Sequence, residues 1–190
     1  MLPVVVNTAN SRIVLIGEGG AAFRRYEFLQ SAGCERLAIY IGNHDGWACL
    51  AEAAVYERWP VADDLAGVTL AFIAGLTREV SVDMAEHARR AGALVNVEDA
   101  PDLSDFHVPA VVRRGDLLLT VSTGGKAPGL AAQIRGYLAR VFGPEWAERL
   151  GSVAEARRRW RDADLAPKDV AKRTQAMVAG EGWLPMERQS

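Results

Sequence analysis

The chain has 190 residues, of which 49% are hydrophobic and 24% are charged, so it can bury a sizeable core and is expected to be globular. A net charge of −2 argues against a nucleic-acid partner, and the longest apolar run, residues 67–76, is about half of what a membrane-spanning helix needs. Two isolated cysteines, Cys34 and Cys49, exclude a disulfide framework, and the start of the chain lacks a signal-peptide pattern, so we expect a cytoplasmic protein.

Strand-length apolar runs alternate with helical patterns through the first part of the chain. The runs are nearly continuous and partly β-branched, and they lie at residues 12–17, 37–42, 69–74 and 93–97. Helices are predicted between them at residues 20–31, 47–57 and 81–91. Nearly continuous apolar runs are typical of parallel strands that are buried on both faces. The alternation therefore predicts an α/β fold with a Rossmann-like, doubly wound parallel sheet.

The pattern changes beyond the predicted sheet. One strand is predicted at residues 116–122 and one helix at residues 128–142, followed by a polar, arginine-rich helical tail. Gly143 and Pro144 mark a break before this tail, and Pro167 marks another within it. We therefore expect three parts, with boundaries at residues 1–112, 113–143 and 144–190.

A glycine-bearing turn joins the first predicted strand to the first predicted helix. Its spacing, Gly17-x-Gly19-x-x-Ala22, is typical of a loop that holds a dinucleotide pyrophosphate at a helix N-terminus. A plain structural strand–helix turn is the alternative. We expect the cofactor to bind along this turn and at the end of the second strand, through Gly17, Gly19, Gly20, Ala21, Gly42 and Asn43.

Two features depart from the usual dinucleotide-binding pattern. Glu18 occupies the turn, and because a carboxylate facing a diphosphate would repel it, this side chain is expected to point to solvent. The acidic residue that normally follows about 20 residues later, and that binds the ribose, is missing, although Asn43 could bind the ribose instead. No arginine stands where a 2′-phosphate would need one, which favours NAD over NADP.

The middle of the chain carries three motifs in a fixed order. They read Asn96-Val97-Glu98-Asp99-Ala100-Pro101, Phe106-His107-Val108-Pro109-Ala110 and Ser122-Thr123-Gly124-Gly125-Lys126-Ala127-Pro128. In order and spacing, over roughly residues 12–140, they resemble the siroheme-synthase N-terminal family of NAD-dependent precorrin-2 dehydrogenases and sirohydrochlorin ferrochelatases. Glu18, the stretch "AGLTRE" at residues 74–79 and His107 depart from the usual family pattern.

The resemblance implies an enzyme that oxidises precorrin-2 to sirohydrochlorin with NAD, and it leaves open whether Fe(II), as a transient substrate, is then inserted. It also implies a homodimer joined through residues 113–143. A noncatalytic sensor or carrier that binds NAD or a tetrapyrrole is the alternative. The second glycine turn lacks Walker A spacing, so a second nucleotide site is not expected. The resemblance implies that this turn binds substrate carboxylates through Ser122, Thr123, Gly124, Gly125 and Lys126, and a plain strand–helix connection is the alternative.

Asp99 is the candidate catalytic residue. It follows the strand at residues 93–97, at the edge where open parallel sheets bind ligands, and it matches the aspartate that the resemblance implicates as a general base. The alternative is an aspartate that only caps its own turn. Asp105 and His107 are secondary candidates for substrate contact. The histidines His44, His87 and His107 have no ligand spacing, so no resident metal site is predicted.

Overall fold

The computed structural model describes residues 1–42 and 54–184. The chain forms two compact units, Met1–Val108 and Pro109–Ser190, each of which is treated separately. The boundary expected at residue 112 falls inside strand β6 (Ala110–Arg114), which pairs within the second unit, so the observed division comes a few residues earlier. Within the described ranges, no helix combines the length and the apolar character needed to cross a membrane.

The first unit is built on a five-stranded sheet in which every pair of neighbours is parallel. Its strands are β1 (Ile13–Gly17), β2 (Leu37–Ile41), β3 (Ala54–Tyr56), β4 (Leu70–Ala74) and β5 (Leu94–Val97). The spatial order is β3-β2-β1-β4-β5, and every residue of β1 and β4 is buried. The predicted doubly wound α/β fold is confirmed. The strand order reverses between β1 and β4, which is where such sheets open a crevice at the carboxyl ends of the strands.

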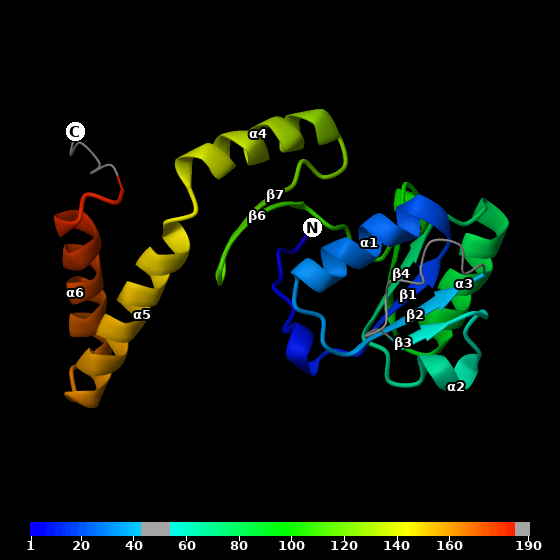
Figure 1. Ribbon diagram of the computed structural model, residues 1–190, viewed down its shortest axis with the longest axis horizontal. Coiled ribbons are helices and arrows are strands. Elements are labelled where there is room, and N and C mark those ends of the chain that lie inside the picture. Colours follow the sequence, from blue (N-terminus) through cyan, green and yellow to red (C-terminus); the bar gives the residue numbers. More distant parts are fainter. Residues whose placement is uncertain (43–53, 185–190) are drawn as a thin grey trace. The chain divides into compact units, whose positions relative to one another are not determined.

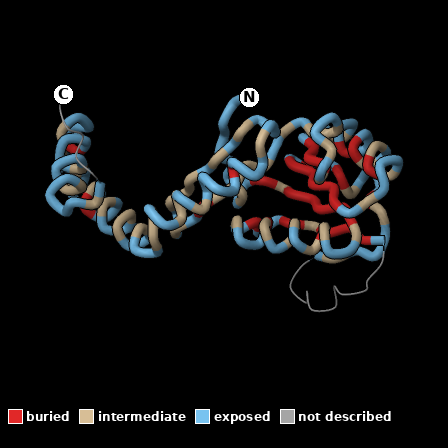
Figure 2. Tube along the Cα trace, turned by 90° about the horizontal axis from the view of Figure 1, so that it is seen from above, coloured by how far each residue is buried: buried red, intermediate tan, exposed pale blue. Residues whose placement is uncertain are grey.

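Helices cover both faces of this sheet (Figure 1). One face packs against α1 (Gly19–Ser31), and the other packs against α2 (Ala62–Leu65) and α3 (Arg78–Arg90). Short 3-10 turns, Thr8–Asn10 and Pro101–Leu103, flank the sheet in sequence. Figure 2 shows the strands as the buried centre of the unit, with exposed residues on the outer sides of the helices. The nearly continuous apolar sequence of the strands is explained by this burial on two faces.

The helix predicted at residues 47–57 is wrong where the structure describes it. Residues 54–56 form β3, which pairs with β2, and residue 57 lies in a bend, while residues 47–53 lie outside the described residues. The ring of Tyr56 stacks on Tyr40 of β2 with 4.9 Å between the ring centroids. Pairing with a neighbouring strand and packing on its aromatic ring have overridden the local helical pattern.

The second unit consists of a β-hairpin and three helices. Strand β6 pairs with the antiparallel β7 (Leu117–Val121), and these are followed by α4 (Pro128–Val141), α5 (Trp146–Asp162) and α6 (Pro167–Gly180). The sequence predicted the second strand of the hairpin but missed β6. Arg114 of β6 ties the hairpin to α4, because its Nε donates to the Phe142 carbonyl at 2.8 Å and its Nη2 donates to the Ala139 carbonyl at 3.0 Å. The predicted helical tail is confirmed as α5 and α6.

Candidate functional site

The first glycine turn lies at the carboxyl end of β1, beside the point where the strand order reverses. Gly17 is packed tightly there: a Cβ atom at this position would overlap the Ala74 carbonyl oxygen and would stand 2.9 Å from the Ala22 Cβ. The first glycine therefore lets α1 and β4 approach the end of β1 closely. This is the packing role that a dinucleotide-binding turn requires of a glycine.

Gly19 behaves differently from Gly17. Its φ of +60° lies in the left-handed region, and no atom lies within 4 Å of the position that a Cβ would take. The helix that begins here has no side-chain cap at its N-terminus, so the first-turn N–H groups of α1 are left for solvent or an anion. An open, positively polarised backbone fits the pyrophosphate of a dinucleotide.

Glu18 does not point into solvent as the sequence analysis expected. Its side chain is half-buried and reaches the end of β2, where a Cβ at Gly42 would overlap Oε1 and would stand 3.0 Å from Cδ. The physical reason is that Gly42 leaves a space into which the carboxylate packs. Gly42 itself is exposed, and the other residue expected at this end of the site, Asn43, lies outside the described residues.

Gly75, which the sequence analysis missed, fixes the backbone of the same turn. It follows β4 with a φ of +73°, and a Cβ there would overlap the Glu18 carbonyl oxygen. The Glu18 N–H donates to the Ala74 carbonyl at 3.1 Å. A glycine directly after the third apolar run was the available sequence signal for this close approach of two strand ends.

Asp99 lies just beyond β5 at the same carboxyl edge. The Glu98 N–H donates to the Ile73 carbonyl at 2.9 Å and extends the pairing of β5 with β4 by one step. Asp99 then turns into the left-handed region, with a φ of 56°, and is exposed. Within the described part of the chain its carboxylate accepts no hydrogen bond, so the turn-capping alternative has no contact to support it.

Arg25 is a second residue that the sequence analysis missed. It lies between Ala22 and Leu29 on the inward face of α1, and its guanidinium carbon stands 5.5 Å from the centroid of the Phe72 ring. Burial lowers the pKa of Arg25, while the charges of Glu98 and Asp99 oppose that shift. A charged residue at an inward-facing helical position was the only sequence signal. The charges of the Arg25 guanidinium and the Asp99 carboxylate therefore influence each other.

The segment after Asp99 is held against the sheet by polar contacts. The Asp105 carboxylate accepts from the Arg89 Nε at 3.0 Å and from the Val95 N–H at 2.9 Å. The buried Asn96 side chain donates to the Phe106 carbonyl at 2.9 Å. Asp105 thus has a structural task, and its contact with substrate stays a prediction, as does that of the exposed His107.

The second glycine turn joins β7 to α4 in the other unit. The Ser122 Oγ accepts from the Gly124 N–H at 3.3 Å, and the Thr123 Oγ1 accepts from the Ala127 N–H at 3.2 Å. Both hydroxyls therefore shape the turn while each keeps a proton to donate. Gly124 and Gly125 have φ values of 65° and 77°, and the neighbouring Lys126 is exposed. Thr123 is half-buried and the other four residues are exposed, and the substrate-binding role of all five stays a prediction.

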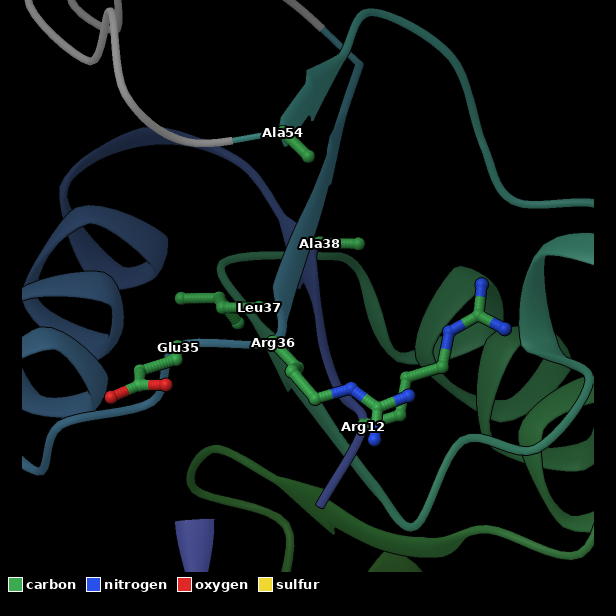
Figure 3. A pocket seen from close by; sticks show the side chains of 6 residues that line it. All are labelled: Arg12, Glu35, Arg36, Leu37, Ala38 and Ala54. Carbon is green, nitrogen blue, oxygen red and sulfur yellow. The ribbon is translucent and has the colours of Figure 1, made fainter. Parts of the chain in front are cut away.

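A hollow of about 330 Å³ lies elsewhere in the first unit (Figure 3). It is lined by Arg12, Glu35, Arg36, Leu37, Ala38 and Ala54. These residues stand at the amino ends of β1, β2 and β3, opposite the edge that carries the glycine turn. Arg12 is already used in packing, because its guanidinium donates to the carbonyls of Ala66 and Asp64 at 2.6 and 3.0 Å. Since ligands of such sheets bind at the carboxyl edge, this hollow is not the candidate site.

The described residues contain no group of three or more histidine, cysteine, aspartate or glutamate side chains that could hold a metal ion. Cys34 is buried in the core, and Cys49 lies outside the described ranges. Where the chain is described, the candidate site thus consists of the first glycine turn, the Asp99 carboxylate and the Arg25 guanidinium.

The profile of a family described as "Putative NAD(P)-binding" matches residues 4–110. The chain belongs to this family. Its curated relatives include the siroheme synthase of Tolumonas auensis, which is 29% identical over 100% of this chain and 44% of the relative. The siroheme synthase of Methylococcus capsulatus is 33% identical over 88% of this chain and 36% of the relative. The resemblance to the siroheme-synthase N-terminal family is confirmed, and the chain spans less than half the length of these relatives.

A solved structure named SirC, precorrin-2 dehydrogenase, matches the chain with a TM-score of 0.76. The match covers 98% of this chain and 93% of that chain, at 18% sequence identity. At this identity the likeness establishes a shared fold, and it includes the hairpin and helices that follow the sheet as well as the sheet itself.

Proposed function

We propose that the chain oxidises precorrin-2 to sirohydrochlorin in the cytoplasm, with NAD as the hydride acceptor, as a step in siroheme biosynthesis. The observation that carries this proposal is the Asp99 carboxylate, which accepts no hydrogen bond in the described chain and stands at the same sheet edge as the open Gly19 turn. The similarity to siroheme synthases and to a precorrin-2 dehydrogenase structure supports the choice of substrate.

The cofactor would be held by backbone rather than by charged side chains. The N–H groups of Gly20 and Ala21 belong to the uncapped first turn of α1 and would bind the pyrophosphate, while Gly17 and Gly19 allow its close approach. Gly42 and Asn43 would adjoin the adenosine at the end of β2. When bound, NAD supplies the site that accepts the hydride.

Asp99 would act as the general base. Oxidation of precorrin-2 releases a hydride and a proton, and the Asp99 carboxylate can take the proton because no backbone group in the described chain occupies it. The positive charge of Arg25, whose pKa is influenced by the charge of Asp99, would attract this carboxylate. If Fe(II) is then inserted, two pyrrole protons must leave, and the same carboxylate could receive them in turn.

The second glycine turn would bind the substrate. Precorrin-2 is a polycarboxylate, and the turn offers Ser122 and Thr123 hydroxyls, the Gly124 and Gly125 backbone, and the exposed Lys126 ammonium. Asp105 and His107 would be secondary substrate contacts. This arrangement assigns the cofactor phosphates to one turn and the substrate carboxylates to the other.

A homodimer is the assembly that the second unit supports best. Large apolar side chains of α4 recur at a spacing of four, three and four residues, and they are all exposed: Leu130, Ile134, Tyr137 and Val141. Residues at this spacing lie along one face of a helix. The described part of this unit has a two-stranded sheet, and such a hairpin is marginally stable by itself. A second copy of the chain would cover the apolar face and extend the packing around the hairpin.

The proposal is tested by mixing purified protein with NAD and precorrin-2 and following the absorbance of NADH and sirohydrochlorin. Stoichiometric formation of both products is expected. A noncatalytic sensor or carrier is the second candidate, favoured by one observation: a carboxylate, that of Glu18, lies beside the turn that would hold the cofactor. Binding of NAD or tetrapyrrole without product would establish that alternative and overturn the first.

A further inference from the structure

Among the described residues, no acid stands at the end of β2, where this kind of fold normally carries one that binds a ribose. In dinucleotide-binding sheets a carboxylate at that position accepts hydrogen bonds from the adenosine ribose, and it disfavours the 2′-phosphate of NADP. Here β2 ends at Ile41 and is followed by Gly42, which has no side chain. The carboxylate of Glu18, from the turn after β1, packs over Gly42.

Contacts of both the backbone and the side chain hold Glu18 in position. Its N–H is bonded to the Ala74 carbonyl, and its own carbonyl lies against Gly75, so the backbone is held between β1 and β4. Its side chain fills the space over Gly42, where the ring of Trp59 also stands 3.0 Å from the place of a Cβ. Any larger residue after β2 would displace the carboxylate, which makes Glu18 and Gly42 complementary.

The Glu18 carboxylate also has no polar partner within the described chain. It is half-buried, it does not cap α1, and within the described chain it forms no hydrogen bond or ion pair. A carboxylate oxygen is an acceptor only, so the natural partners for it are hydroxyl or amide donors. The two hydroxyls of a ribose are such donors, whereas a phosphate at the 2′ position would be repelled.

We propose that Glu18 binds the adenosine ribose hydroxyls and selects NAD over NADP. In this chain the acid of the second strand has been replaced by one from the first turn, and Gly42 provides the room for it. The assignment rests on the proposed NAD-dependent function and makes Glu18 a specificity-determining residue of that site.

The test is calorimetric titration of the purified protein with NAD and with NADP, without substrate. We compare the unsubstituted chain with Glu18→Gln, which keeps the shape, and with Glu18→Ala. The matched control is Glu27→Gln, which removes a carboxylate from the exposed face of α1. Glu18→Ala should weaken NAD binding about tenfold, the scale of one lost charge-assisted hydrogen bond, and Glu18→Gln should reduce the preference for NAD over NADP about tenfold. The control should match the unsubstituted chain for both ligands.

The possible contrary results are distinct. If the unsubstituted chain binds NAD but both Glu18 variants, folded by circular dichroism, keep the same NAD and NADP constants, Glu18 only packs against Gly42 and the assignment is overturned while the proposed function stands. If Glu18→Ala binds NAD more tightly, the carboxylate obstructs the cofactor, which also overturns it. If the unsubstituted chain binds neither dinucleotide, the proposed function itself fails, and this assignment with it.

Discussion

Replacement of Asp99 is the sharpest test of the proposed chemistry, because its effects on activity and on stability have separate causes. As a general base, Asp99 contributes through a proton that asparagine cannot accept, so Asp99→Asn should reduce kcat by about 10²-fold or more. Asparagine tolerates the left-handed backbone at this position nearly as well as aspartate does. Because no hydrogen bond to the Asp99 side chain exists in the described chain, we expect the fold and the affinity for NAD to be almost unchanged.

Asp99→Ala separates the backbone effect from the chemical one. Alanine should lose the same activity as asparagine, but it also meets the left-handed backbone without a polar side chain, at a cost of roughly 1 kcal/mol. For a protein of this size that corresponds to a fall in Tm of about 2–4 °C. The assay is the initial rate of NADH formation with saturating NAD and precorrin-2, together with a thermal melt of each variant.

Asp102→Asn is the matched control for both substitutions. Asp102 is a nearby exposed aspartate whose carboxylate pairs with the exposed Arg78, the first residue of α3. Its replacement should leave kcat unchanged. Nearly full activity of Asp99→Asn, combined with a strong loss of stability in Asp99→Ala, would refute the reasoning and restore Asp99 as a turn-capping residue.

Four further outcomes are expected. Gly19→Asp should weaken NAD binding measured by calorimetry without lowering Tm by more than a few degrees, because the new side chain projects into the open space that the pyrophosphate needs. Lys126→Ala should raise the KM for precorrin-2 several-fold and leave the NAD constant unchanged, which a direct comparison of both constants would check. Light scattering should find the unsubstituted chain as the proposed dimer and Tyr137→Glu as a monomer, because this substitution places a charge in the apolar face of α4. Finally, the hydrogen bond from Arg58 holds the pKa of Asp64 well below its usual range. The Asp64 carboxylate therefore stabilises the fold above its unfolded pKa of about 4, and this stabilisation is lost as the pH falls further. Asp64→Asn should make the free energy of unfolding less dependent on pH in this acid range.

The strands of the sheet could be predicted where burial on both faces requires a nearly continuous apolar sequence. β1, β2, β4 and β5 are nearly continuous apolar runs, and each was placed to within about a residue or two, which is the usual uncertainty of element ends. β3 was not, because its three described residues become a strand only through pairing with β2. β6 was missed because its two terminal arginines break the apolar pattern, although Arg114 is used to anchor α4.

The site was predictable only where a residue acts through its place in a motif. Asp99 follows a strand and belongs to a recognisable turn, so its position at the sheet edge could be deduced. The influence of the Asp99 charge on the pKa of Arg25 could not be deduced, because it depends on how α1 packs over Phe72 of β4. The direction of Glu18 was predicted wrongly for a similar reason: the space that receives its side chain is created by Gly42, which is remote in sequence.

The glycines around the first turn show how packing and ligand binding can be told apart. A Cβ at Gly17 or Gly75 would collide with backbone oxygen atoms of the protein, so glycine is required there by the fold itself, whether or not a cofactor binds. A Cβ at Gly19 would meet no protein atom. The fold places no packing demand on that side of Gly19, and an open backbone at a helix N-terminus is what a bound anion would use. At Gly42, a side chain is excluded in part by the carboxylate of Glu18. This carboxylate has no hydrogen-bond partner in the described chain, and the hydroxyls of a ribose would provide one.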